Sequence, residues 1–247
     1  MELNLLSLVI PVYNEEPNIA EACSGLRITL NSLCFPYEII VVDDGSKDRT
    51  FSILQDIQAN DSRMKVVKLA KNYGQAYAFW AGFDISKGDV VITMDGDLQN
   101  DPADIPLFLK EIEKGFEAVN GWRHARDDSC VRKSISCLAN WFIGLKTGVK
   151  LHDYGCAFMA IRRSLMHRLL SRGRGCRFIK PLIVCLAQSI GEIRIRHHPR
   201  KHGNSKYSLL KIFKTGLHFA FSFKARLFKR QASRFIIENP RYLGSKT

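Results

Sequence analysis

The chain has 247 residues, enough for one large domain or for one domain with an appendage. Its formal net charge is +13, and the excess lies almost wholly in residues 193–237, which hold twelve Lys or Arg and no Asp or Glu. The rest of the chain carries 25 basic and 24 acidic residues. A near-neutral body with a basic end is typical of a protein that docks on an anionic membrane surface, and it argues against a nucleic-acid-binding domain.

Cysteine usage and hydropathy bound the compartment. The seven cysteines are odd in number, scattered and without a C-x-x-C pair, which indicates free thiols in a reducing compartment. The first residues lack the basic region of a signal peptide. No run reaches the roughly 18–20 apolar residues of a membrane-spanning helix, so we expect peripheral membrane contact unless a partner subunit supplies the span.

Apolar runs alternate with helical patterns over the first half of the chain. Buried parallel strands are predicted at residues 6–11, 38–43, 64–69 and 90–95, because these runs are apolar throughout. Helices are predicted between them at residues 17–33, 50–60 and 75–86. This order predicts an α/β fold with an open, mainly parallel sheet flanked by helices, which binds ligands at the carboxyl ends of its strands.

The second half is less regular. The patterns predict helices at residues 131–147, 164–171 and 179–189, and strands at residues 157–161 and 192–197. We expect one domain over residues 1–206 and a basic, Phe-rich amphipathic helical tail over residues 207–247. An apolar stripe with flanking Lys and Arg favours a place for the tail in the membrane interface, and the alternative is a helix packed on the core.

Acidic residues follow three of the predicted strands. Asp95, Asp97 and Gln99 follow the fourth, and in an extended segment residues i, i+2 and i+4 share a face. Three hard oxygen ligands at one point suit Mg²⁺ or Mn²⁺. The alternative is a surface turn rich in Asp and Gly. The acidic ends of two other strands favour the metal site.

Asp43 ends the second predicted strand. It could be a helix cap, but its position favours hydrogen bonds from a nucleobase or ribose. Neither G-x-G-x-x-G nor G-x-x-x-x-G-K-[ST] follows the first strand, so a dinucleotide site or a P-loop is not expected. We expect the metal to neutralise a diphosphate instead.

Five motifs together carry a resemblance to a known family. They are VIPVYNE at residues 9–15, VDDGS at 42–46, KNYG at 71–74, MDGDLQ at 94–99 and GNSKY at 203–207. In this order they resemble family 2 glycosyltransferases of the GT-A fold, and more narrowly the branch that glycosylates polyprenyl phosphates such as dolichyl or undecaprenyl phosphate. The resemblance runs from about residue 5 to 213. Many members of that branch continue into two transmembrane helices, whereas this chain has the Phe-rich basic segment.

The resemblance implies roles for individual residues. A nucleotide-sugar is expected to contact Pro11, Tyr13, Glu15, Val41, Asp43, Asp95 and Gly96, and the metal to bind Asp95, Asp97 and Gln99. The acceptor or diphosphate is expected to contact Arg123, Arg132, Arg200 and Lys206, each of which could instead be a surface charge. The resemblance also places Asp153 beside the expected reaction centre, and Asp153 and Asp97 are the expected catalytic residues. A phosphate monoester has a second pKa of about 6, so we expect Asp153 to orient substrate more than to remove a proton.

The resemblance also implies an inverting, metal-dependent transfer of a sugar from a UDP- or GDP-linked donor to a polyprenyl phosphate. The expected location is peripheral, on the cytoplasmic side of a bacterial membrane, with a possible homo-oligomer or membrane subunit as partner. Two alternatives stay open. One is a family 2 transferase with a saccharide or protein acceptor, and the other is a non-catalytic basic protein that binds membrane or nucleic acid.

Overall fold

The computed structural model describes residues 3–33, 35–124 and 130–199, with the side chains of the fifth helix described from Ser134 on. The strands are β1 (Leu6–Val12), β2 (Tyr37–Asp43), β3 (Met64–Lys68), β4 (Val90–Thr93), β5 (Ala118–Arg123), β6 (Met159–Arg162) and β7 (Ile190–Ile195). The α-helices are α1 (Ile19–Asn31), α2 (Thr50–Ala59), α3 (Gln75–Ile85), α4 (Ile105–Glu113), α5 (Cys130–Thr147), α6 (Arg163–Gly173) and α7 (Ile179–Leu186). A short 3₁₀ helix, Pro102–Asp104, precedes α4.

The strands form one sheet in the order β3-β2-β1-β4-β6-β5-β7. All neighbours are parallel except β6, which runs antiparallel to both β4 and β5. The carboxyl ends of β1, β2, β4 and β5 therefore lie at the same edge as the amino end of β6. Loops that follow the first four strands and the loop that precedes β6 meet there.

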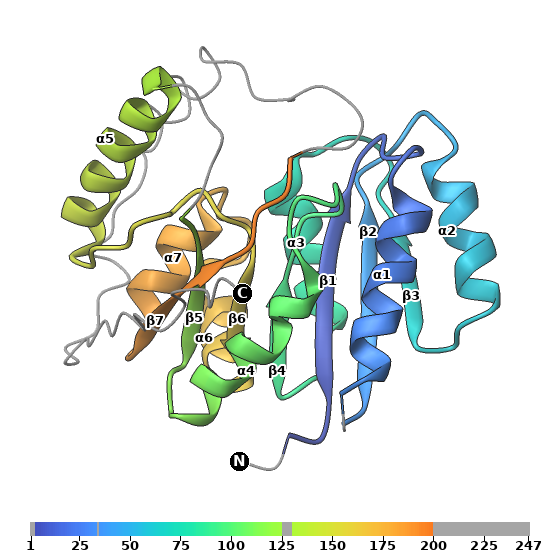
Figure 1. Cartoon of the computed structure of the whole chain (residues 1–247), viewed down its shortest axis with the longest axis horizontal. Coiled ribbons are helices and arrows are strands. Elements are labelled where there is room, and N and C mark those ends of the chain that lie inside the picture. The colour runs from blue at the N-terminus through green and yellow to red at the C-terminus, as the bar shows by residue number, and fades with distance from the viewer. Residues whose placement is uncertain (1–2, 34, 125–129, 200–247) are drawn as a thin grey trace, which may run out of the picture.

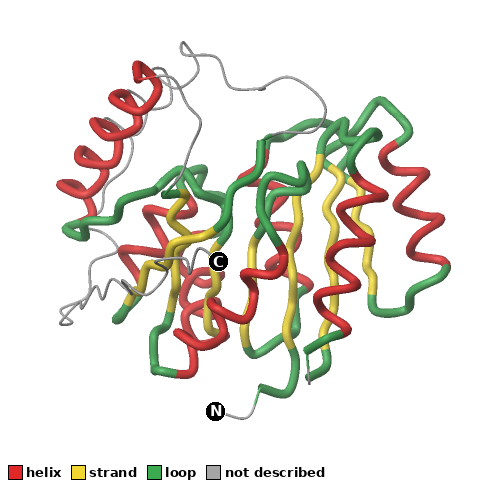
Figure 2. Tube along the Cα trace, viewed as in Figure 1, coloured by secondary structure: helices red, strands yellow, loops and turns green. Residues whose placement is uncertain are grey.

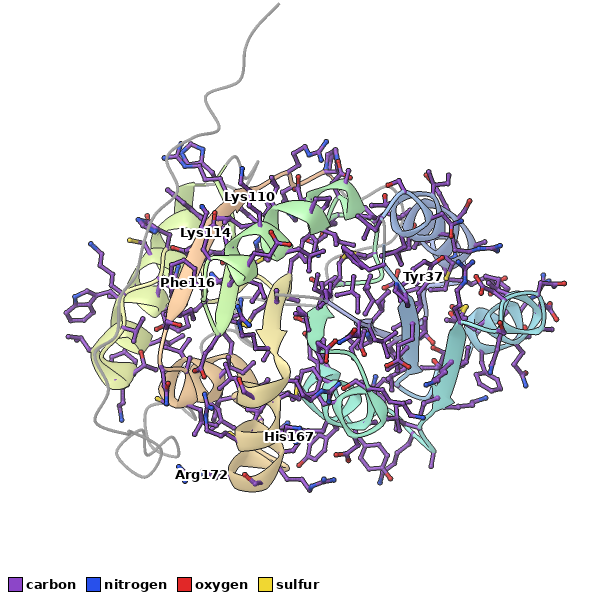
Figure 3. The ribbon with its side chains drawn as sticks, turned by 90° about the horizontal axis from the view of Figure 1, so that it is seen from below. Tyr37, Lys110, Lys114, Phe116, His167 and Arg172 are labelled. Carbon is purple, nitrogen blue, oxygen red and sulfur yellow. The ribbon has the colours of Figure 1, made fainter. Side chains whose placement is uncertain are left out.

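Helices cover both faces of the sheet, as Figures 1 and 2 show. One apolar cluster joins Val9, Ile40 and Val91 to residues of α3, α6 and α7. A second joins the alternate strand residues, such as Leu8 and Ile39, to α1, α2 and α4. Because successive side chains of a strand point to opposite faces, the apolar runs fill both clusters at once. Figure 3 shows Lys110 of α4 and His167 of α6 on opposite sides of the sheet.

Helix α5 stands at the end of the sheet that carries β7, outside the two helical layers (Figure 1). It contacts α7, and its residues Phe142 and Ile143 pack against the first cluster. Its outer side is apolar and exposed, as described below.

The α/β class and the mainly parallel sheet predicted from the sequence are confirmed. The sequence patterns gave no element between residues 96 and 130, so α4 and β5 were missed. The third strand was expected to be buried throughout, but β3 lies at the sheet edge and most of its residues are half-buried or exposed. The expected tail at residues 207–247 lies outside the described residues.

Candidate active site

The Asp43-Asp44-Gly45 turn follows β2 and fixes the start of α3. The Asp44 carboxylate accepts hydrogen bonds from the backbone N–H groups of Tyr73 and Gly74, each at 2.8 Å. Gly45 has a φ of +71°, and a Cβ there would lie 2.5 Å from the backbone carbonyl carbon of Lys71. Only glycine combines this conformation with such a close approach. Burial raises the pKa of Asp44, although these N–H groups oppose the shift.

Asp43 is fully buried at the carboxyl end of β2. Its Oδ1 accepts a hydrogen bond from the Ser46 N–H at 3.1 Å, whereas its Oδ2 is buried without a hydrogen-bond partner among the described residues. A buried carboxylate oxygen normally has a partner. This oxygen therefore keeps the capacity to accept a hydrogen bond from a ligand.

Asp95 and Asp97 lie just beyond β4. The expected extended geometry is wrong, because the chain bends at residues 96–98 and Leu98 adopts a left-handed φ of +63°. Gln75, the first residue of α3, donates its amide N–H to Asp95 Oδ1 at 2.7 Å. Burial, together with the charge of Asp97, raises the pKa of Asp95 to about 6. Burial and a neighbouring like charge therefore disfavour the ionised form of Asp95.

Gln99 lies after the bend. Its backbone N–H donates to Asp97 Oδ1 at 3.2 Å, and its side-chain Nε2 donates to the His198 carbonyl at 3.4 Å. The amide oxygen of Gln99 keeps its capacity to bind a cation, since an amide carries separate donor and acceptor groups.

Asp153, in the loop before β6, forms an ion pair with Arg123 at the end of β5. Arg123 Nε donates to Asp153 Oδ2 at 2.7 Å, and the second guanidinium nitrogen donates to Oδ1 at 3.0 Å. The side chains are 15% and 3% exposed. Burial alone would lower the pKa of Arg123, but the Asp153 carboxylate raises it above its ordinary value. Two residues predicted for the acceptor side thus form one buried bidentate pair.

Two residues that the sequence analysis missed hold this loop. Glu192 of β7 accepts hydrogen bonds from the backbone N–H groups of His152 and Asp153 and lies 2.7 Å from His152 Nδ1. Asn120 of β5, also buried, donates its amide to Glu192 Oε1 at 2.7 Å and to the Asp153 carbonyl at 3.1 Å. These contacts join positions 33–72 residues apart, which no local pattern predicts.

The remaining predicted residues lie as follows. Pro11 lies in β1, and Tyr13 is the residue directly after that strand. The Cα of Gly96 packs closely against the side chains of Val12 and Ile10. Glu15 is buried, and its carboxylate accepts a hydrogen bond from the side-chain amide of Asn18. Its backbone carbonyl accepts hydrogen bonds from the N–H groups of Asn18 and Ile19 at the start of α1. The sequence analysis did not assign this role at the start of a helix. Val41 is fully buried inside β2. Arg132 lies in α5 but its side chain is outside the described part of the chain, as are Arg200 and Lys206.

Comparison with known proteins identifies the family. The family model described as glycosyl transferase family 2 matches residues 7–170. The chain belongs to glycosyl transferase family 2. This range holds the turn after β2, the Asp95–Asp97 pair and the Arg123–Asp153 pair.

Two curated relatives of this family 2 chain carry names that state a substrate. The undecaprenyl-phosphate 4-deoxy-4-formamido-L-arabinose transferase of Pseudomonas paraeruginosa is 42% identical over 211 residues, which is 85% of this chain and 62% of that protein. The dodecaprenyl-phosphate galacturonate synthase of Rhizobium johnstonii is 38% identical over 231 residues, which is 90% of this chain and 68% of that protein. The chain thus spans about 62% of the length of the first of these relatives.

Solved structures confirm the fold. Glucosyl-3-phosphoglycerate synthase from Mycobacterium tuberculosis, solved with Mn²⁺, UDP and glucosyl-3-phosphoglycerate, matches with a TM-score of 0.65 at 18% identity and covers 90% of this chain and 80% of its own. A mannosyltransferase from Pyrobaculum calidifontis, solved with GDP-mannose and Mn²⁺, matches with a TM-score of 0.53 at 17% identity and covers 75% of this chain and 53% of its own. The GT-A fold expected from the motifs is therefore correct.

The family 2 site of this chain has the donor groups that a divalent cation needs. Among the described residues no cluster of three or more His, Cys, Asp or Glu is arranged to hold a metal. Mg²⁺ and Mn²⁺ fit smaller sets, because they use one or two carboxylates together with water and substrate phosphates. Asp95 and Asp97, two neighbouring carboxylates, are a set of that size.

The exposed side of α5 is an apolar surface within the described part of this family 2 chain. Leu138, Trp141 and Leu145 are 65%, 61% and 61% exposed and recur at i, i+3 and i+7, so they form one stripe. None of the helices in the described residues is both long and apolar enough to cross a membrane.

Proposed function

We propose that this chain transfers a sugar from a nucleotide-sugar donor to a polyprenyl phosphate, with a divalent cation at Asp95 and Asp97. The observation that carries the proposal is the meeting of two charged pairs at one sheet edge. The carboxylates of Asp95 and Asp97 lie close enough for the charge of Asp97 to raise the pKa of Asp95, and the charge of Arg123, which pairs with Asp153, acts on Asp95 in the opposite sense. The names of the two relatives support a polyprenyl phosphate as the acceptor.

The donor half consists of the ends of β1, β2 and β4. We assign the nucleoside to Pro11, Tyr13 and the buried carboxylate of Asp43, whose Oδ2 has no partner among the described residues. Asp95, Asp97 and the Gln99 amide oxygen would hold the cation. When bound, Mg²⁺ or Mn²⁺ neutralises the donor diphosphate and so stabilises the charge of the leaving nucleoside diphosphate.

The acceptor half consists of Arg123 and Asp153. A phosphate monoester is largely a dianion near pH 7, so its oxygen is already a nucleophile. We propose that this oxygen forms a bond to the anomeric carbon while the bond from that carbon to the diphosphate oxygen breaks, which inverts the configuration in one displacement. The contacts of Asp153 leave it an orienting role, because both of its oxygens already accept hydrogen bonds from Arg123.

We also propose that α5 faces the membrane that holds the acceptor. Trp and Leu side chains exposed in one stripe suit the boundary between headgroups and hydrocarbon. Asn140, on α5, donates to the His152 carbonyl at 2.6 Å and accepts from the Tyr154 N–H at 3.2 Å. The helix is thereby tied to the loop that carries Asp153. The expected side of the membrane is cytoplasmic, since nucleotide-sugars are the donors. We keep Arg132, Arg200 and Lys206 as proposed contacts of the acceptor or diphosphate, and the basic tail as a proposed further membrane contact.

The test is transfer of radiolabel from a nucleotide-sugar to lipid that partitions into organic solvent. A panel of UDP- and GDP-sugars is assayed with undecaprenyl phosphate and Mn²⁺ or Mg²⁺. We expect Asp97→Asn to abolish transfer with little change in the free energy of unfolding, because it removes a charged ligand at nearly constant volume. The matched control is Asp56→Asn, an exposed residue of α2. Full transfer by folded Asp97→Asn protein, or by wild type in excess chelator, would refute the metal site.

A further inference from the structure

Lys180 is the only charged residue of α7, whose sequence is otherwise apolar except for a proline. It is half-buried, and its Nζ donates to Asn120 Oδ1 at 2.5 Å and to the Cys156 carbonyl. Both acceptors are neutral. A Lys inside an apolar helix is unusual unless its charge is used.

The charge of Lys180 has no counterion at contact distance among the described residues. The nearest carboxylates are committed elsewhere, because Asp153 holds Arg123 and Glu192 accepts from Asn120 and from the His152 loop. An ammonium also has three N–H donors, and only two have acceptors in the described part of the chain. An anion that reaches the third donor would give this cation a charged partner that the described residues do not provide.

Lys180 Nζ lies beside the loop that carries Asp153, because its partner Asn120 also donates to the Asp153 carbonyl. Its charge acts on Asp95 at the donor end and is acted on by Asp153 and Arg123 at the acceptor end. Burial lowers the pKa of Lys180, as expected for an ammonium whose neighbours do not fully compensate it. Asn120 fixes the side chain, since its Oδ1 takes Lys180 while its Nδ2 is held by Glu192.

We propose that Lys180 binds an anionic oxygen of a substrate at the point of transfer, either a carboxylate on the transferred sugar or the phosphate of the acceptor. The proposal rests on the proposed function and assigns to it a residue that neither the motifs nor the sheet edge identified. Lys180 would act as a specificity-determining residue. A sugar carboxylate would make the chain prefer uronic acid donors, and an acceptor phosphate would make Lys180 set the affinity for the lipid.

The experiment compares wild type with Lys180→Met and Lys180→Arg as full chains with Mn²⁺. The probes are UDP-glucuronic acid and UDP-glucose in binding titrations, and undecaprenyl phosphate in detergent micelles for the KM of transfer. Lys110→Met, on the exposed face of α4, is the matched control (Figure 3).

If Lys180 binds a sugar carboxylate, Lys180→Met should lose at least tenfold in affinity for UDP-glucuronic acid and little in affinity for UDP-glucose. If Lys180 binds the acceptor phosphate, Lys180→Met should keep its affinities for both donors, and its KM for the lipid should be at least tenfold higher than that of wild type. In either case Lys180→Arg retains more of the wild-type value than Lys180→Met, because it keeps the charge. A structural role alone would lower stability without either shift.

A folded Lys180→Met protein with all three values within twofold of wild type overturns the proposal. If that variant does not fold, Lys180→Gln replaces it, because its amide can still donate to Asn120 without a charge, and the same thresholds decide. Wild type that binds neither nucleotide-sugar and forms no lipid product refutes the proposed function and this inference together. An active wild type with unaffected Lys180 variants refutes this inference alone.

Discussion

The Arg123–Asp153 pair allows a quantitative test of how the acceptor half is built. The two hydrogen bonds measure 2.7 and 3.0 Å, and the side chains are 15% and 3% exposed, so water screens the pair weakly. Breaking a buried pair by removing one partner costs about 3–5 kcal/mol, since an uncompensated charge stays behind. We expect Asp153→Asn to lower the free energy of unfolding by about 3 kcal/mol, because the remaining amide oxygen still accepts one hydrogen bond.

The assay is a double-mutant cycle in urea with Asp153→Asn, Arg123→Met and the double variant. The two single variants together should lose more free energy of unfolding than the double variant loses. The difference, which is the coupling energy, should be about 1–3 kcal/mol. The matched control is Asp84→Asn in the exposed Arg174–Asp84 pair, whose side chains are 63% and 35% exposed. Exposed pairs contribute about 0–1 kcal/mol. Additivity within about 0.5 kcal/mol at Arg123 and Asp153 would show that the two side chains do not form the pair described.

Two further predictions concern buried carboxylates. Asp43→Asn should weaken donor binding about tenfold or more in a titration with the active nucleotide-sugar, because it removes a charged acceptor worth about 1.5–3 kcal/mol; equal affinity would place the nucleoside elsewhere. Burial alone would raise the pKa of Glu38, but hydrogen bonds from Lys65, Ser7 and the Lys87 N–H lower it below its ordinary value. Its stabilisation is therefore present above about pH 4.5 and is lost as pH falls through the folded pKa. Glu38→Gln should destabilise the protein to urea at pH 7 by about 1.5–3 kcal/mol, and its gap from wild type should narrow at pH 3; a gap that widens would contradict this reasoning.

The sequence predicted the donor half of the fold well, for a physical reason. The strands β1, β2 and β4 are buried on both faces, so their sequences are mostly apolar, without regular alternation, and stand out from their surroundings. Their polar endings then predict the sheet edge at which Asp43 and Asp95 lie. The bend after Asp95 was not predicted, because Leu98 adopts a positive φ that few residues other than glycine adopt.

The acceptor half was less predictable because its strands carry polar residues. The sequence of β5 is AVNGWR, and its buried Asn120 and Gly121 break the apolar run that would have revealed a strand. Asn120 is buried because Glu192 and Lys180 satisfy its amide, and both lie at least 60 residues away in the chain. Arg123 and Asp153 meet only because β6 runs antiparallel to its neighbours, which no local pattern specifies.

The two halves of the edge differ in how completely the chain satisfies its own charges. On the acceptor side both oxygens of Asp153 accept hydrogen bonds from Arg123, and Glu192 accepts from the loop that it holds, whereas the hydrogen-bond acceptors of Lys180 are neutral. On the donor side burial and the charge of Asp97 raise the pKa of Asp95, and Asp43 Oδ2 has no partner in the described part of the chain. A ligand stabilises a protein by what it adds to the native state. The cation and the nucleotide-sugar should therefore stabilise the donor half, and an anionic group that reaches Lys180 should stabilise the acceptor half.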